Sequence, residues 1–144
     1  MSFLSKSDFR THIYQEVIDL ITHQDDTVLT TIITAAIGLM KTYLNRYDLV
    51  ALFGTPTTDP TYPDEFLKSL AKDIVAYKLA IIANPNINIT TLRTGYEDAI
   101  ESLKSIMKGG GDPAWPLKPD DPTTPNDDAG LIEFRSNTKR TNYF

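Results

Sequence analysis

Two histidines, His12 and His23, are the residues of this chain best suited to metal binding or acid–base chemistry. Their spacing does not match H-E-x-x-H, the pattern that places two zinc ligands one helical turn apart. The chain also has no cysteine, which excludes disulfide bonds, thiol nucleophiles and cysteine-ligated zinc. We therefore expect both histidines to lie on helix surfaces, and we expect no metal site and no cofactor.

Acidic residues outnumber basic ones by 19 to 14, but most stand where helix caps and solvated surfaces use them. Asp25 and Asp26 directly precede a long apolar stretch, where a carboxylate favours the positive N-terminus of a helix. Catalysis by two carboxylates requires surroundings that separate their pKa values, and the sequence indicates no such pair. Asp73 stands in a strongly apolar stretch, and we expect it to be partly exposed or ion-paired.

Two other patterns associated with catalysis are incomplete. Lys108 and the three glycines that follow it lack the order G-x-x-x-x-G-K-[ST], which cradles a phosphate. No serine stands in the nucleophile pattern G-x-S-x-G. The glycine run is better explained as a helix stop followed by a hinge. We therefore expect no catalytic residue, and an enzyme is the function class that the sequence favours least.

Length and charge favour a single acidic domain. The 144 residues are enough for one hydrophobic core and too few for two comfortable ones. A net charge of -5 argues against a general nucleic-acid binder, which would normally be basic. The first ten residues lack the apolar core of a signal peptide, so we expect synthesis in the cytosol. Threonines and Lys41 interrupt the apolar stretch 27–44, so we expect a buried helix there and no membrane span.

The elements that would position any site are helices. Apolar residues recur at spacings of three and four, and no strand pattern is present in the first 108 residues. We therefore predict an all-α fold, a small four-to-five-helix bundle over residues 1–108 with a long extended C-terminal arm over residues 109–144. The predicted helices span residues 7–22 with a break near 14–15, 26–44, 47–53, 63–83 and 90–107.

Two of these helices have apolar stripes that predict how they pack. The helix at 26–44 has two adjacent stripes, which predicts a position in the centre of the bundle or against a neighbouring subunit. The helix at 7–22 has one stripe, which we expect to face the core. That stripe comprises Phe9, Ile13, Val17, Leu20 and Ile21.

The arm has the composition of an extended segment. Residues 112–128 are rich in proline and aspartate and contain Trp115, the single tryptophan. This tryptophan is either an anchor in a partner's pocket or a cover for an apolar groove on its own bundle, and the sequence favours neither. A short strand is predicted at 131–135, with Ile132 and Phe134 on one side. A lone strand needs a partner to pair with, so we expect another subunit to supply it.

The last residues of the arm combine basic and aromatic side chains. They could contact nucleic acid or an acidic protein surface, and the alternative is a solvated tail. Together with the residues above they form the predicted partner-binding set of the arm: Trp115, Leu117, Ile132, Phe134, Arg135, Lys139, Arg140, Tyr143 and Phe144.

Nearly the whole chain resembles a family of small helical proteins from Mu-like prophages and Bacteroidetes phages. The resemblance is in the stretches FLSKSDFRTHIY, AAIGLMKTYLNRYDLVALF, VAYKLAIIANPNI and GYEDAIESLKSIMKGG. The ending EFRSNTKRTNYF is similar to a family ending with S-N-P-K-R, with Thr138 in place of the proline.

This resemblance implies a phage head–tail connector, also called an adaptor or head-completion protein. Such proteins form a ring beneath the portal, usually of twelve copies, with arms that dock on the portal and on neighbouring subunits. The implied partners are copies of itself, the portal, tail or tail-completion proteins and passing DNA without sequence recognition. The implied location is the virion neck, after assembly in the host cytoplasm. The alternative function is a free helical interaction module or a phage regulator.

Overall fold

The computed structural model describes residues 3–83 and 89–119, and within these ranges the chain forms helices and no strand. The predicted all-α class is confirmed. The strand predicted at 131–135 lies outside the described residues. The elements are the 3-10 helix η1 (Lys6–Thr11) and the α-helices α1 (Gln15–Thr22), α2 (Asp26–Tyr43), α3 (Leu49–Phe53), α4 (Glu65–Ile82) and α5 (Ile89–Met107).

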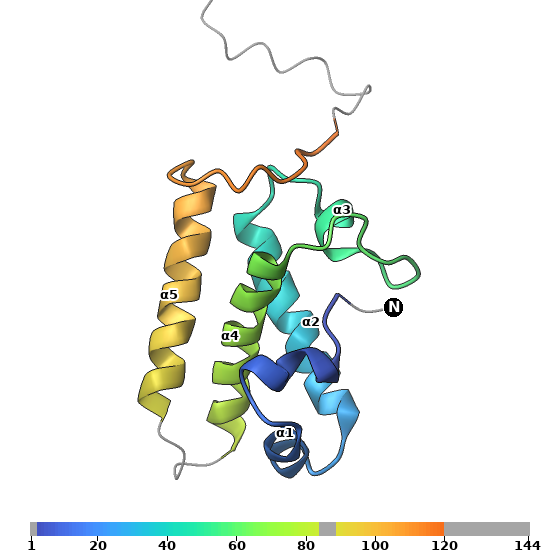
Figure 1. The fold of residues 1–144 in the computed structure, drawn as a ribbon, viewed down its shortest axis with the longest axis vertical. Helices are drawn as coiled ribbons and strands as arrows, with labels where there is room; N and C mark the ends of the chain where they lie inside the picture. Colours follow the sequence, from blue (N-terminus) through green and yellow to red (C-terminus); the bar gives the residue numbers. More distant parts are fainter. Residues whose placement is uncertain (1–2, 84–88, 120–144) are drawn as a thin grey trace, which may run out of the picture.

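The three long helices lie side by side, with α4 between α2 and α5 and running opposite to both (Figure 1). Helix α1 and η1 pack near the lower end of this layer in the view of Figure 1, and α3 lies at the upper end. Helix α4 makes its most extensive contacts with α5, fewer with α2, and also contacts α1.

The helix starts follow from acidic caps. The side chain of Asp25 accepts a hydrogen bond from the Thr27 N–H, and that of Asp64 accepts one from the Leu67 N–H. Asp48 accepts two, from the amides that open α3. Each carboxylate satisfies donors that have no partner inside the helix.

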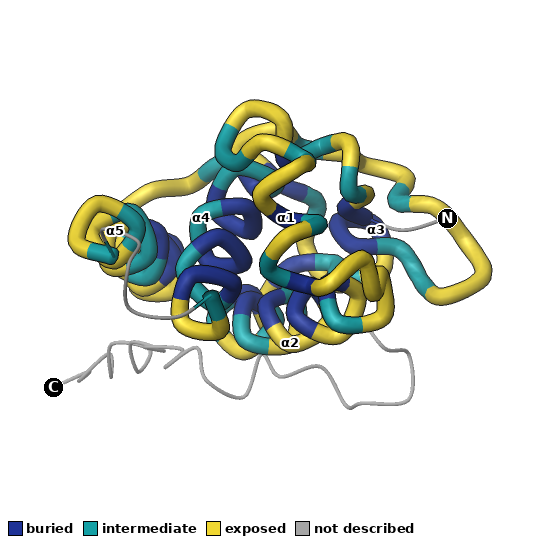
Figure 2. The backbone as a smooth tube through the Cα atoms, turned by 90° about the horizontal axis from the view of Figure 1, so that it is seen from below, coloured by how far each residue is buried: buried dark blue, intermediate teal, exposed yellow. Residues whose placement is uncertain are grey.

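The core shows that α4, not α2, is the central helix. Only one of the two apolar stripes predicted for α2 is fully buried. In the other stripe Ala35 is exposed, and Val28, Leu39 and Tyr43 are half-buried. Figure 2 shows buried and exposed stretches alternating around α2. The central position predicted as one alternative for α2 is therefore wrong. Helix α4 instead buries Leu67, Leu70, Ala71, Lys72, Ile74, Val75, Ala76, Leu79 and Ala80.

The break predicted near residues 14–15 is confirmed, and it changes which face of α1 is buried. Phe9 is fully buried in η1, but α1 begins only at Gln15, after an extended residue at Tyr14. Because a 3-10 helix has 3.0 residues per turn and the chain bends after it, the phase of the stripe is lost. Helix α1 buries Ile18 and Thr22, whereas Val17 and Leu20 are exposed. The inward position predicted for these last two residues is wrong.

The start of the expected arm belongs to the packed domain. Residues 112–118, which we call the strap, cross the upper end of the helices (Figure 1). The Asp48 N–H donates to the Pro116 carbonyl at 2.9 Å, and the Lys118 N–H donates to the Arg46 carbonyl at 3.1 Å. Tyr47 and Leu117 form an isolated antiparallel bridge. The packed domain thus continues beyond the boundary predicted at residue 108.

Candidate interaction surface

Trp115 is buried in its own chain. Only 3% of its surface is exposed, and its ring packs edge-on against Tyr47 with centroids 5.5 Å apart. The Phe66 ring lies 6.4 Å from it on another side. The backbone bonds of the strap hold the indole in this position. The alternative of an anchor in a partner's pocket is therefore wrong for this structure, and the alternative of a cover over the bundle is right.

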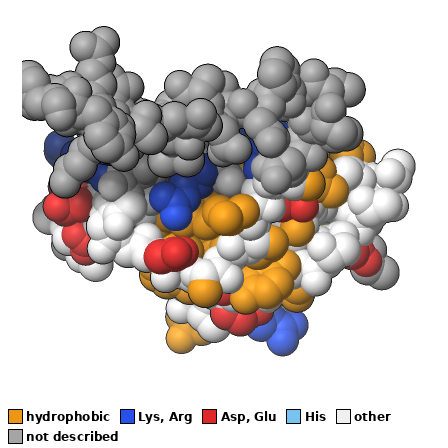
Figure 3. All heavy atoms as spheres, turned by 90° about the horizontal axis from the view of Figure 1, so that it is seen from above, with side chains coloured by type: hydrophobic (Ala, Val, Ile, Leu, Met, Phe, Trp, Pro, Cys, Tyr) orange, Lys and Arg blue, Asp and Glu red, His pale blue; other side chains and the backbone are white. Residues whose placement is uncertain are grey.

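Leu117 is placed differently from its neighbour Trp115. Its backbone pairs with Tyr47, but 63% of its surface is exposed. It remains a candidate contact residue on the upper end, where hydrophobic side chains lie among acidic and basic ones (Figure 3). The other predicted contact residues lie outside the described residues: Ile132, Phe134, Arg135, Lys139, Arg140, Tyr143 and Phe144.

The lower end carries an apolar surface that sequence reasoning missed. Tyr14 and Leu20 are each 76% exposed and Val17 is 37% exposed. A spacing of three residues places them along one side of α1. Ile81, near the end of α4, is 58% exposed. We call Tyr14, Val17, Leu20 and Ile81 the α1 face. The signal for its α1 residues was the break at Tyr14, because restarting the helical phase there turns Val17 and Leu20 outward.

A hollow of about 220 Å³ adjoins the α1 face, between α1, α4 and α5. It has room for about one aromatic side chain. Contiguous exposed apolar surface of this kind marks a site of interaction more often than isolated apolar residues do. The hollow is lined by His12, Ile13, Tyr14, Val17, Ile21, Ala76, Ala80 and Leu92.

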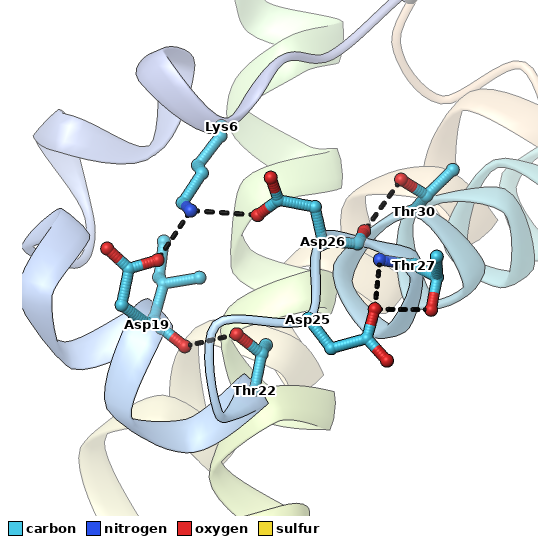
Figure 4. A network of polar contacts seen from close by, with 8 residues as sticks. Lys6, Asp19, Thr22, Asp25, Asp26, Thr27 and Thr30 are labelled. Atoms are coloured by element: carbon cyan, nitrogen blue, oxygen red, sulfur yellow. Dashed lines mark hydrogen bonds and ion pairs between the residues drawn. The ribbon is translucent and has the colours of Figure 1, made fainter.

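The charge around the α1 face is acidic. Helix α1 contains Glu16 and Asp19 and no lysine or arginine. Lys6 forms an ion pair with Asp19 and another with Asp26 at 2.8 Å (Figure 4). The hydrogen bonds that Lys6 donates, first to Asp19 and then to Asp26, raise its pKa. The two ion pairs tie η1 to α1 and to the start of α2.

A polar cluster borders the same hollow. His12 Nε2 lies 3.3 Å from Asp73 Oδ1, and His12 Nδ1 lies 2.8 Å from Thr11 Oγ1. The Nζ of the buried Lys72 donates to the same hydroxyl at 3.4 Å. His12 is thus partly buried and ion-paired, which corrects the prediction of a helix-surface residue; His23 is exposed at the end of α1, as predicted.

Asp73 is partly exposed and ion-paired, as the sequence predicted. Burial raises its pKa; the nearby His12 acts in the opposite direction, and Asp98 adds to the increase. The order hydroxyl, imidazole, carboxylate is that of a hydrolase triad. The cluster mainly fastens η1 to α4.

The described residues contain neither a metal-binding cluster nor a membrane-spanning helix. Within residues 3–83 and 89–119, no group of three or more histidine, aspartate or glutamate residues is placed to hold a metal ion. No helix in those ranges is long and apolar enough to cross a bilayer. No family model, no curated protein and no solved structure matches the chain.

Proposed function

We propose that this protein is a structural subunit of a phage neck, a head–tail connector that forms a ring between portal and tail. The observation that supports an assembly role is the α1 face, because a domain of this size gains nothing in folding from leaving Tyr14 and Leu20 76% exposed. The more specific identity comes from the resemblance of nearly the whole sequence to connector proteins.

A ring needs two different surfaces on each subunit, since each copy meets the next one head to tail. The α1 face is one candidate. The outer stripe of α2, with Ala35 exposed and Leu39 half-buried, is a second. These surfaces belong to different helices, so they can contact two neighbours at once. The proposed partners are copies of the chain, twelve by the resemblance, together with the portal and tail or tail-completion proteins.

The charge of the chain suits the proposed place in the virion. DNA must pass through a neck without binding to it, and a net charge of -5 disfavours tight binding to phosphates. The proposed location is the virion neck, with assembly in the host cytoplasm. No catalytic step and no cofactor form part of this proposal.

Two other functions remain as alternatives. A free helical interaction module or phage regulator would also use an exposed apolar face, but it would be a monomer or dimer. A hydrolase would use the row of Thr11, His12 and Asp73. The oligomeric state of the chain on its portal separates the first alternative from the proposal, and Thr11→Val tests the second.

The proposed function is tested with a chain truncated just after the packed domain. Deleting residues 112–144 would remove Trp115 from the core, so a stop after Pro119 is the informative variant. We expect the truncated chain to keep its helical circular dichroism and its thermal transition but to lose recruitment to the portal, measured by native mass spectrometry. Full recruitment of the truncated chain would contradict a docking role for residues 120–144, and failure of the full-length chain to be recruited would contradict the connector function.

A further inference from the structure

We propose that the α1 face is the docking site for residues 131–144 of a second copy of this chain. The proposal deepens the proposed function and rests on it, because it names the surface through which one subunit of the assembly holds the next.

The surface offers both shape and chemistry for such a segment. The hollow beside Val17 is lined by Ala76 and Ala80 of α4, whose small side chains fill little space. Its volume of about 220 Å³ suits one large apolar side chain. Around it, Tyr14 and Leu20 supply apolar contact area. A few buried apolar side chains at about 25 cal/mol per Å² are enough to fix a short segment, provided that its ordering cost is met.

The segment 131–144 has the complementary chemistry. It begins with Leu131, Ile132 and Phe134, which are apolar, and it continues with basic residues. Three of its side chains are basic and one is acidic, whereas α1 has no basic residue and presents the exposed carboxylate of Glu16, its other acidic residue, Asp19, being paired with Lys6. Opposite charges of this kind favour encounter and fix orientation more than they add affinity.

The fold directs the segment to a groove rather than to a sheet. An extended peptide commonly pairs with the edge of a sheet, but residues 3–83 and 89–119 contain no strand whose edge it could extend. The alternating pattern that places Ile132 and Phe134 on one side would therefore be used against an apolar hollow. Phe134 is the residue we assign to the hollow, since it is the only aromatic side chain among residues 131–135.

The strap ends far from the α1 face of its own copy. The Lys118 N–H is bonded to the Arg46 carbonyl at the upper end, whereas α1 lies at the lower end (Figure 1). Docking on the same copy would require the chain to run the length of α4, whose 18 residues span about 27 Å. A head-to-tail ring instead needs contacts between copies, so the proposed function assigns the segment to a second copy.

A photo-cross-link tests the proposal, because it identifies the surface that the segment contacts and shows whether that surface belongs to another copy. A photoreactive benzoylphenylalanine replaces Phe134 in isotope-labelled full-length protein, which is mixed with unlabelled Phe134-containing protein, irradiated and digested. We expect cross-linked peptides that join the labelled segment to unlabelled residues 13–24. We expect Leu20→Glu in the unlabelled copy to reduce their yield at least tenfold, which corresponds to about 1.4 kcal/mol. Val50→Glu is the matched control: Val50 is 57% exposed at the opposite end, and we expect no loss of yield.

Each other outcome decides against the proposal. Cross-links from the labelled segment to labelled residues 13–24 alone, with none to unlabelled residues 13–24, would show docking within one copy. Cross-links between copies at another surface would contradict the site, and the absence of cross-links between copies in the portal-bound assembly would contradict the docking. The mass of that assembly is recorded on the same sample. A full ring without these cross-links overturns only this proposal, whereas the absence of a ring overturns the proposed function.

Discussion

Large apolar side chains are buried at the upper end of the helical layer and exposed at the lower end. At the upper end the strap brings Trp115 onto Tyr47 and leaves it 3% exposed. At the lower end Tyr14 and Leu20 remain 76% exposed. The upper end is thus closed by the chain's own residues, and among the described residues nothing closes the lower end.

This difference distinguishes residues that stabilise the fold from residues that are available to contact other chains. Residues at the closed end stabilise the fold, because their burial depends on one chain alone. Residues of the α1 face add little to folding, so we expect their substitution to change association and leave the domain intact. Paired substitutions at each end test that division.

The largest expected effect is at Trp115. Trp115→Ala removes a fully packed aromatic side chain and is expected to lower the free energy of unfolding by about 3–5 kcal/mol. Leu117→Ala, two residues further along the strap, is the control and should change it by less than about 0.5 kcal/mol, because Leu117 is 63% exposed. Urea unfolding followed by circular dichroism measures both. Equal effects of the two substitutions would contradict the closed upper end.

The next largest change in unfolding free energy is expected at Ile18, and its neighbour Val17 in α1 gives the comparison. Ile18 is fully buried and Val17 is 37% exposed. Ile18→Ala should lower the free energy of unfolding by about 2–5 kcal/mol, whereas Val17→Ala should change it by about 0.5 kcal/mol or less. Thermal and urea unfolding of the two variants give the comparison. A larger loss for Val17→Ala would restore the stripe predicted from the sequence and would remove the α1 face.

A smaller effect is expected at a helix cap near the strap. Asp48 accepts hydrogen bonds from the Val50 and Ala51 amides, each at 3.0 Å. Asp48→Ala should lower the free energy of unfolding by about 1 kcal/mol. Asp48→Asn retains an acceptor and should recover most of that loss. If both variants are equally destabilised, the carboxylate has a role other than capping.

The smallest expected effect is on the pH dependence of the free energy of unfolding, through Asp73. Because burial raises its pKa above the ordinary 3.8, the folded chain binds this proton more tightly than the unfolded chain does. The resulting stabilisation is complete below pH 3.8 and is lost as the pH rises through the raised pKa. Relative to wild type, Asp73→Asn should therefore gain stability as the pH rises from below 3.8 to neutral.

Asp8 provides the control of opposite sign for this pH effect. Burial acts to raise its pKa, but hydrogen bonds from Ser5 hold the pKa below the ordinary value. Relative to wild type, Asp8→Asn should lose stability over the same rise in pH. The free energy of unfolding is measured by urea titration at a series of pH values. Two slopes of the same sign would contradict the assigned surroundings of these carboxylates.

Sequence patterns predicted the helices well and their packing less well. Apolar spacing and the acidic cap at Asp25 are local features, so the helix positions could be predicted from them. The central role of α4 and the outward turn of Leu20 depend on contacts between helices that are distant in sequence, and no local pattern contains that information. The burial of Trp115 likewise depends on Tyr47, 68 positions earlier in the chain.

The most direct test of the account is the mass of the full-length chain alone and with its cognate portal, measured by native mass spectrometry for wild type, Leu20→Glu and Val50→Glu. The account predicts that the portal recruits many copies of wild type and of Val50→Glu but few or none of Leu20→Glu. A wild-type chain that remains a monomer or dimer and does not bind the portal would contradict the proposed connector function. Recruitment of Leu20→Glu at the wild-type level would contradict the role of the α1 face.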